Sequence, residues 1–299
     1  MDFRQQISKN KRMSGVLVFG FVLLLASLGY AIGFFWLGSP SFGLGIAVFI
    51  SIIYALIGYF AGANMALSSV GAIEITPETS DQKHKQIYNI VEEIRLSSGV
   101  PMPRVWVIPS NALNAFATGM SPEKGHVAFT EGLIRKLNRE EIKAVAAHEV
   151  AHIKNYDIRL MLFASVLAGA IVMIAEIGFR AALFGGGGRN RDGRGAIFMF
   201  FIGLAFAILA VILAQLARMA LSRNREYLAD ATAVEFTRYP EGLASALEKI
   251  AGDTTQLRGA SSLTSEMFIK DPVKKNFMHS LFATHPPIED RIARLRNRG

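Results

Sequence analysis

The residues best suited to chemistry are two histidines four positions apart, His148 and His152, with Glu149 between them. On a helix, residues i and i+4 project from one face, so both imidazoles can bind the same divalent ion. Glu149 is within reach of a water molecule on that ion. The surrounding sequence is largely apolar, and burying such polar groups without a partner is costly. A bound metal ion is therefore a simpler explanation than a pair of solvated histidines.

A catalytic zinc ion takes three protein ligands and one water molecule, so the two histidines need a third partner. The next histidine along the chain, His279, is too distant for the spacing of the metzincins. Glu226 and Asp230 lie four residues apart and would share a helix face. Glu226 as a ligand, with Asp230 accepting a hydrogen bond from a ligating histidine, makes a chemically sensible pair. Spacing alone fits two solvated acids equally well.

The apolar residues are gathered in blocks, which indicates a membrane protein with a water-facing part. Hydrophobic residues make up 51% of the 299 and charged residues 19%, and the mean hydropathy is +0.32. Four long uncharged or nearly uncharged runs are each long enough to form a membrane helix. They occupy residues 14–38, 42–65, 160–179 and 196–217.

The first two runs are predicted to span the membrane, and the last two to form a helical hairpin over 160–217. A basic N-terminus stays in the cytoplasm, so two spans return the chain to that side. The loop of the hairpin is rich in arginine, which is unusual for an outside loop. Because the first helix usually dominates topology, we predict four spans, with the hairpin crossing fully. The alternative is a hairpin that inserts only in part and packs on the water-facing domain.

The sequence between the second and third apolar runs is typical of a folded, water-facing segment. We predict a helix over 86–96, a strand over 104–108, short strands over 112–119 and 126–130, and a helix from Arg139 through the histidines. The expected fold is thus a predominantly α integral membrane protein with a small β-sheet. We divide it into an N-terminal membrane region, 1–66, and a domain with the predicted metal site, 67–299, interrupted by the hairpin at 160–217.

The net charge of +8 and the absence of cysteine limit the possible partners and ligands. Aromatic residues are not interleaved with basic ones as in nucleic-acid-binding proteins, so anionic lipid is the favoured partner and nucleic acid is not expected. Without thiols, a metal site must use histidine and carboxylate ligands.

Several stretches together closely resemble the HtpX-type membrane zinc metallopeptidases. They are His-Glu-Val-Ala-His-Ile-Lys-Asn-Tyr-Asp at 148–157, Ser-Arg-Asn-Arg-Glu-Tyr-Leu-Ala-Asp at 222–230, and Thr-His-Pro-Pro at 284–287. Asn-Ala-Phe-Ala-Thr-Gly at 114–119 also resembles the strand before that family's active-site helix. The likeness covers nearly the whole chain. The sequence differs mildly from the common family pattern at Phe129, Glu131 and Leu228, and these differences leave the substrate preference open.

The resemblance implies a gluzincin fold in which His148, His152 and Glu226 hold one Zn²⁺ per chain and Glu149 is the general base. It also implies proteolysis of misfolded or damaged membrane proteins under stress, by a multi-pass protein of the plasma membrane whose catalytic domain faces the cytoplasm. The related CAAX prenyl proteases have more membrane spans and a longer zinc motif than this sequence. The resemblance therefore favours the HtpX-type proteases, which degrade damaged membrane proteins.

The expected mechanism assigns further residues around the ligands. Glu149 would take a proton from the attacking water and pass it to the leaving amine. His285, or as second choice Tyr227, would stabilise the oxyanion, although His285 could simply cap the last helix. Asp230 and Asn155 are placed beside the ligands.

Two expectations concern residues outside that centre. The strand residues Asn114, Ala115, Phe116 and Ala117 could form an edge that pairs with an extended substrate, or an ordinary core strand. His84 and His126 have no convergent partners in the sequence and are expected at the surface.

Other functions remain possible on chemical grounds. A prenyl-peptide protease would use the same site on a narrower substrate. A zinc transporter would place its ligands within the spans, whereas these lie at their water side. A non-proteolytic metal-binding scaffold needs no general base and usually closes its site with four ligands, so Glu149 argues against it.

Overall fold

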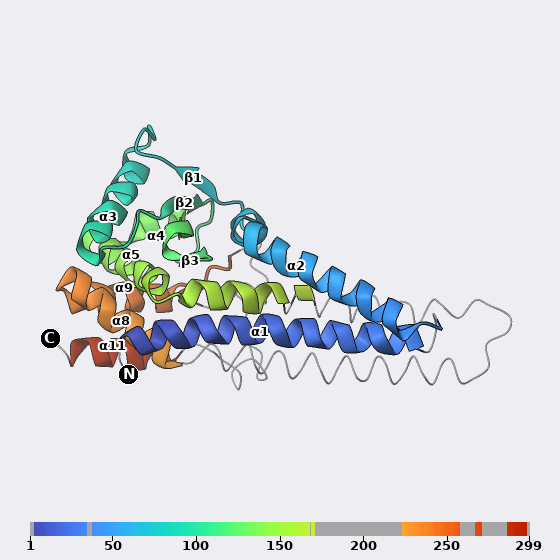
Figure 1. Ribbon diagram of the computed structural model, residues 1–299. Helices are drawn as coiled ribbons and strands as arrows, with labels where there is room; N and C mark the ends of the chain where they lie inside the picture. Colours follow the sequence, from blue (N-terminus) through green and yellow to red (C-terminus); the bar gives the residue numbers. More distant parts are fainter. Residues whose placement is uncertain are drawn as a thin grey trace.

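The computed structural model describes residues 3–34, 38–167, 169–170, 223–257, 267–270 and 286–297. Within these residues the protein is mostly helical with one small sheet, so the expected fold class is confirmed. Two long helices, α1 (Phe3–Ile32) and α2 (Pro40–Ser69), extend from one side of a domain that contains the sheet and the shorter helices (Figure 1).

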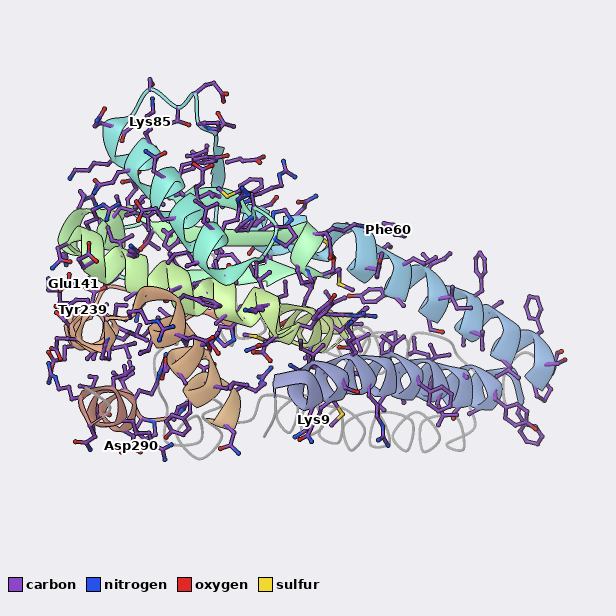
Figure 2. The ribbon with its side chains drawn as sticks, turned by 60° about the vertical axis from the view of Figure 1, so that its left-hand side comes forward. Lys9, Phe60, Lys85, Glu141, Tyr239 and Asp290 are labelled. Atoms are coloured by element: carbon purple, nitrogen blue, oxygen red, sulfur yellow. The ribbon has the colours of Figure 1, made fainter. Side chains whose placement is uncertain are left out.

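Both long helices have the length and composition of membrane spans. In the described part of the chain, the segments that qualify are Ile7–Ala31 and Pro40–Ser69. On α2 large apolar side chains face outward, and Phe60, labelled in Figure 2, is 70% exposed. Helix α1 begins well before the apolar run expected at 14–38, because its polar start is made of lysine, arginine and glutamine, which are good helix formers.

Helices α1 and α2 pack closely where small residues meet. A Cβ atom on Gly43 would lie 2.2 Å from the carbonyl oxygen of Gly29, and one on Gly29 would lie 2.4 Å from that of Gly43. Contact between glycines lets two helix backbones approach closely, which is the usual way apolar helices associate in a membrane.

The sheet has four strands in the order β1-β2-β4-β3. Strands β2 and β4 are parallel, and the other two pairs are antiparallel. The predicted strand 104–108 is present as β2, β3 is shorter than the predicted 112–119, and the three-residue β1 was not expected. The bounds are β1 (Ile73–Ile75), β2 (Arg104–Ile108), β3 (Ala115–Gly119) and β4 (Gly125–Thr130).

Helix α5 (Arg139–Lys154) is the centre of the domain. It starts with a capping box, in which the Asn138 side chain accepts from the Glu141 amide and the Glu141 carboxylate accepts from the Asn138 amide. It packs against β3, β4 and three helices (Figure 1). The three helices are α3 (Gln82–Ser98), α8 (Arg223–Thr237) and α9 (Pro240–Gly252). The domain also contains α4 (Glu131–Lys136) and α11 (Ile288–Arg296).

After α5 the chain turns at Asn155 and Tyr156 and is helical again from 157 to 167. This segment packs on both long helices: Leu160 joins an apolar cluster with α1, and Val166 lies against Gly58 of α2. The rest of the expected hairpin lies outside the described residues, so its depth and the boundaries proposed for the two regions stay predictions.

The close contact between α1 and α2 gives a test. Gly43→Ala should destabilise the protein by about 1–3 kcal/mol, because the new methyl group overlaps the backbone of α1. Gly45→Ala is the matched control, since a Cβ atom there would meet nothing within 4 Å. Thermal unfolding in detergent measures both; equal unfolding temperatures for the two variants would contradict this packing.

Candidate metal centre

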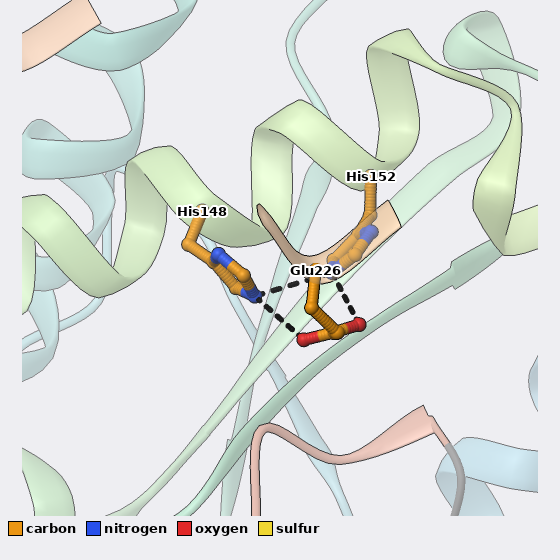
Figure 3. Close-up of side chains that lie close together, drawn as sticks. All are labelled: His148, His152 and Glu226. Atoms are coloured by element: carbon orange, nitrogen blue, oxygen red, sulfur yellow. Dashed lines mark hydrogen bonds and ion pairs between the residues drawn. The ribbon is translucent and has the colours of Figure 1, made fainter. Parts of the chain in front are cut away.

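Helices α5 and α8 bring two imidazoles and one carboxylate together in the interior. The His148 and His152 Nε2 atoms lie 3.2 Å apart, and each is 3.6 Å from one oxygen of Glu226 (Figure 3). All three residues are buried, and their potential ligand atoms lie within 4.8 Å of one another.

The spacing of these atoms suits a single small cation. Zinc is bound at about 2.0–2.2 Å by histidine nitrogen and carboxylate oxygen, in a tetrahedral arrangement. Ligand atoms at that radius lie about 3.4 Å from one another, from the geometry of a tetrahedron. The distances between the three side chains are 3.2, 3.6 and 3.6 Å. The two 3.6 Å distances run to different oxygens of Glu226, and one ligand atom from each of the three residues lies within 4.8 Å of the others. Two imidazoles and a carboxylate this close together form a donor set that zinc can use.

Both histidines are oriented by carboxylates on their far side. The Nδ1 atom of His148 lies 3.0 Å from an oxygen of Asp230, and that of His152 lies 3.0 Å from an oxygen of Asp157. A carboxylate on Nδ1 fixes the ring and leaves Nε2 available as a ligand. Asp230 lies where the sequence predicted, whereas Asp157 was not identified as a functional residue.

Arg291 of α11 is a second residue that sequence reasoning missed. It is fully buried and donates from Nε and Nη2 to the two oxygens of Asp230, at 2.9 and 2.6 Å. Its Nη1 lies 3.3 Å from Glu226. The sequence does contain a signal, because Arg291 shares an i, i+3, i+4, i+7 stripe with three apolar residues, Ile288, Ile292 and Leu295. A charge in such a stripe requires a buried partner.

The surroundings change the proton affinities of two key groups. Burial and the nearby Arg291 charge lower the pKa of His148, but hydrogen bonds and charges from Asp230 and Glu226 prevail and raise it to about 9. A metal ion must therefore displace a proton from this histidine. Burial raises the pKa of the Glu149 carboxyl, against the opposing charges of His148 and His152.

Other residues predicted for the site lie farther from the ligands or outside the described residues. Asn155 is fully buried and lies beside the centre, where its backbone oxygen accepts a hydrogen bond from Asn10. Its own side-chain atoms have no hydrogen-bond partner among the described residues. Tyr227 follows Glu226, and its ring stacks under Arg294, 3.7 Å from the guanidinium carbon. His285 lies outside the described residues.

The outer edge of β3 is occupied by another segment of this chain. Phe116 pairs with Phe268 in an antiparallel bridge, and the Ile269 amide donates to the Ala115 carbonyl at 3.0 Å. Asn114 contacts Lys270 twice: its side-chain nitrogen donates to the Lys270 carbonyl and its oxygen accepts from the Lys270 amide. We call residues 267–270 the strap. The predicted substrate strand is thus an edge strand of the sheet that the strap covers.

Neither histidine expected at the surface is a plain surface residue. His126 is buried in β4, whose two faces are both covered, and it accepts a hydrogen bond from Trp106. Burial, helped by the Arg104 charge, lowers its pKa to about 4, so it stays neutral at physiological pH. His84 lies 2.7 Å from Glu131.

Comparisons with known proteins identify the family of this chain. The family described as "Peptidase family M48" matches residues 81–299. A protein named "Protease HtpX homolog" from Ligilactobacillus salivarius is 44% identical over 296 residues, covering 98% of this chain and 99% of its own. Another of that name from Streptococcus agalactiae is 44% identical over 297 residues, with the same coverage of both chains.

One solved structure has a similar fold. The crystal structure of S. mikatae Ste24p superposes with a TM-score of 0.52 and 17% sequence identity. The match covers 97% of this chain and 66% of that chain. At this identity the likeness concerns the fold alone.

Arg291 provides a test of how the ligands are held. Arg291→Lys should weaken metal binding about 10-fold to 100-fold, because a lysine keeps the charge but cannot bridge Asp230 with two bonds. Arg294→Lys, on the exposed side of the same helix, should leave the affinity unchanged. Competition with a chelator measures both; unchanged affinity in Arg291→Lys would show that Arg291 does not support the ligands.

Proposed function

This chain belongs to peptidase family M48, which makes it a metalloprotease acting on polypeptides, and on that premise we propose a zinc-dependent endopeptidase of the cell membrane. The observation that carries the proposal is the convergence of His148, His152 and Glu226, with a carboxylate behind each imidazole. Two imidazoles and one carboxylate, with a fourth position left for water, are the usual ligands of a catalytic zinc ion.

The bound zinc ion would lower the pKa of a water molecule and polarise the scissile carbonyl. Glu149 would accept a proton from the attacking water and deliver it to the departing amine. Its position supports this role, because it follows His148 on α5 and is buried, so its raised pKa favours accepting a proton. The oxyanion needs a further donor, for which His285 stays the candidate.

We further propose that the catalytic domain faces the cytoplasm and that the chain crosses the membrane several times, through α1, α2 and the 160–217 hairpin. Asn10 of α1 contacts Asp157, so the N-terminus and the metal centre lie on one side of the membrane. Lys9, Lys11 and Arg12 flank that contact, and basic residues stay on the cytoplasmic side.

The proposed substrates are misfolded or damaged membrane proteins and unfolded polypeptides, in a quality-control role during stress. Two features support them: near-full-length relatives are named as HtpX protease homologues, and the metal centre lies beside helices that suit a membrane. Lipid is the second proposed partner, through the outward apolar face of α2.

Substrate backbone is proposed to pair with β3 at Asn114, Ala115, Phe116 and Ala117. The strap makes the same kind of antiparallel contact there, and the side-chain amide of Asn114 donates to the Lys270 carbonyl and accepts from the Lys270 N–H. The contact with the strap supports the proposal that this edge can pair with an extended substrate. A substrate can use the edge only after the strap leaves.

Glu149→Gln tests the general base. This variant should retain zinc but lose cleavage of an unfolded protein such as casein by at least about 100-fold, because an amide cannot take the proton. Glu226→Ala is the contrasting variant and should lose tight zinc binding as well. Cleavage and zinc content are measured on protein purified in detergent; wild-type cleavage by Glu149→Gln would exclude Glu149 as the base.

Phe268→Ala tests the strap. Its ring packs on Phe116 with centroids 4.7 Å apart, so truncation should loosen the strap and expose β3 more often. The apparent KM for a peptide substrate should then fall about 10-fold, since less free energy is needed to open the edge. Leu162→Ala, a truncation in the same apolar cluster away from the strap, controls for general loosening. A KM that rises in Phe268→Ala would contradict pairing at β3.

A further inference from the structure

A polar residue of the first membrane helix reaches the metal centre. Asn10 is only 2% exposed, although it lies in the lysine-rich and arginine-rich start of α1. Its side-chain nitrogen donates to the Asn155 carbonyl at 2.9 Å and to an oxygen of Asp157 at 2.6 Å. These contacts join residues about 145 positions apart in the sequence.

Asp157 connects Asn10 to His152, a predicted metal ligand. One of its oxygens accepts from Asn10, and the other lies 3.0 Å from the Nδ1 atom of His152. Asp157 is fully buried, and its other charged neighbour, Arg225, is 3.8 Å away. The Asn10 amide therefore holds the carboxylate from the side opposite the imidazole, which fixes the direction in which His152 presents Nε2.

The turn that carries Asp157 is held by α1 at the adjacent position as well. Tyr156 has a positive φ of 59°, a backbone conformation that a tyrosine adopts only when its surroundings favour it. The Lys11 ammonium lies 4.1 Å from the centre of its ring. Two successive residues of α1 thus contact three successive residues of the turn, 155–157.

Helix α1 also docks through an apolar contact that does not involve Asn10. Farther along the helix, Leu17, Phe21 and Leu24 are buried against Leu160, Ala164 and Leu167 of the segment after α5. The buried amide at position 10 therefore requires another explanation, and its bond to Asp157 provides one.

We propose that Asn10 is a positioning residue of the metal centre, so that the first membrane helix is a structural part of the active site as well as an anchor. The inference rests on the proposed function only through the assignment of His152 as a ligand. Removing the amide should leave Asp157 free to rotate, and His152 with it, which weakens metal binding and slows the chemical step.

The test uses the full-length protein in detergent and zinc as the probe. Asn10→Leu keeps the approximate size of the side chain but removes the donor, and Asn10→Ala is the second variant. Both should weaken zinc binding about 10-fold to 100-fold in competition with a chelator. In the zinc-loaded protein, kcat should fall while KM changes little, because the substrate-binding edge is untouched.

Leu17→Ala is the matched control, because it weakens the docking of the same helix without touching the polar contacts. It should lower the unfolding temperature but leave zinc affinity within about two-fold of the wild type. Equal losses of zinc affinity in Leu17→Ala and Asn10→Leu would mean that Asn10 acts only through docking, and would overturn the proposal.

Asp157→Ala, alone and combined with Asn10→Leu, tests whether Asn10 acts on His152 through Asp157. If Asn10 acts through Asp157, the double variant should bind zinc as weakly as Asp157→Ala alone. Additive losses, or unchanged zinc affinity in both Asn10 variants, would overturn the inference. His152→Ala distinguishes failure of the inference about Asn10 from failure of the proposed function. If the His152→Ala variant binds zinc as tightly as the wild type, the assignment of His152 as a ligand is wrong.

Discussion

The structure depends on how buried charges are balanced where α5 and α8 meet. Four buried carboxylates, those of Glu149, Asp157, Glu226 and Asp230, face two buried guanidinium groups, Arg225 and Arg291. With the acids ionised, two negative charges remain, and one divalent cation would neutralise them. Without a metal, a proton on His148, whose pKa is about 9, supplies part of that charge. Buried charges are tolerated only when paired, so this balance restricts which arrangements of these helices are stable.

The groups of this centre come from several separate parts of the chain. Helix α5 carries the histidines and α8 carries Glu226, while the supporting residues come from the turn after α5, from α11 and from α1. The residues of the centre run from Asn10 to Arg291 in the sequence. The family match begins at residue 81. The alignment with the relative from Ligilactobacillus salivarius covers 98% of this chain, so the aligned region includes position 10. The residues of the centre lie near both ends of the sequence, and the similarity to these relatives extends over nearly the whole chain.

Local patterns in the sequence were enough to predict the helices of the centre but not the contacts between them. The i, i+4 spacings of His148 with His152, and of Glu226 with Asp230, directly follow helix geometry. Strand β2 follows from its β-branched and aromatic residues, whereas β1 has only three residues and gives too short a pattern. The roles of Asp157 and Asn10 depend on tertiary contacts, and no periodic pattern in the sequence indicates such contacts. His126 was misjudged because burial on both faces of β4 depends on neighbouring elements.

The supporting contacts also constrain where the centre lies relative to a lipid bilayer. Asn10 is close to the beginning of the membrane-compatible segment of α1, which starts at Ile7. On the proposed topology, the metal ion would be held at the level where α1 enters the membrane, with the segment after α5 running along the same helix. The same geometry makes the helix a poor candidate for a detachable anchor, because separating it would remove the partner of a buried carboxylate.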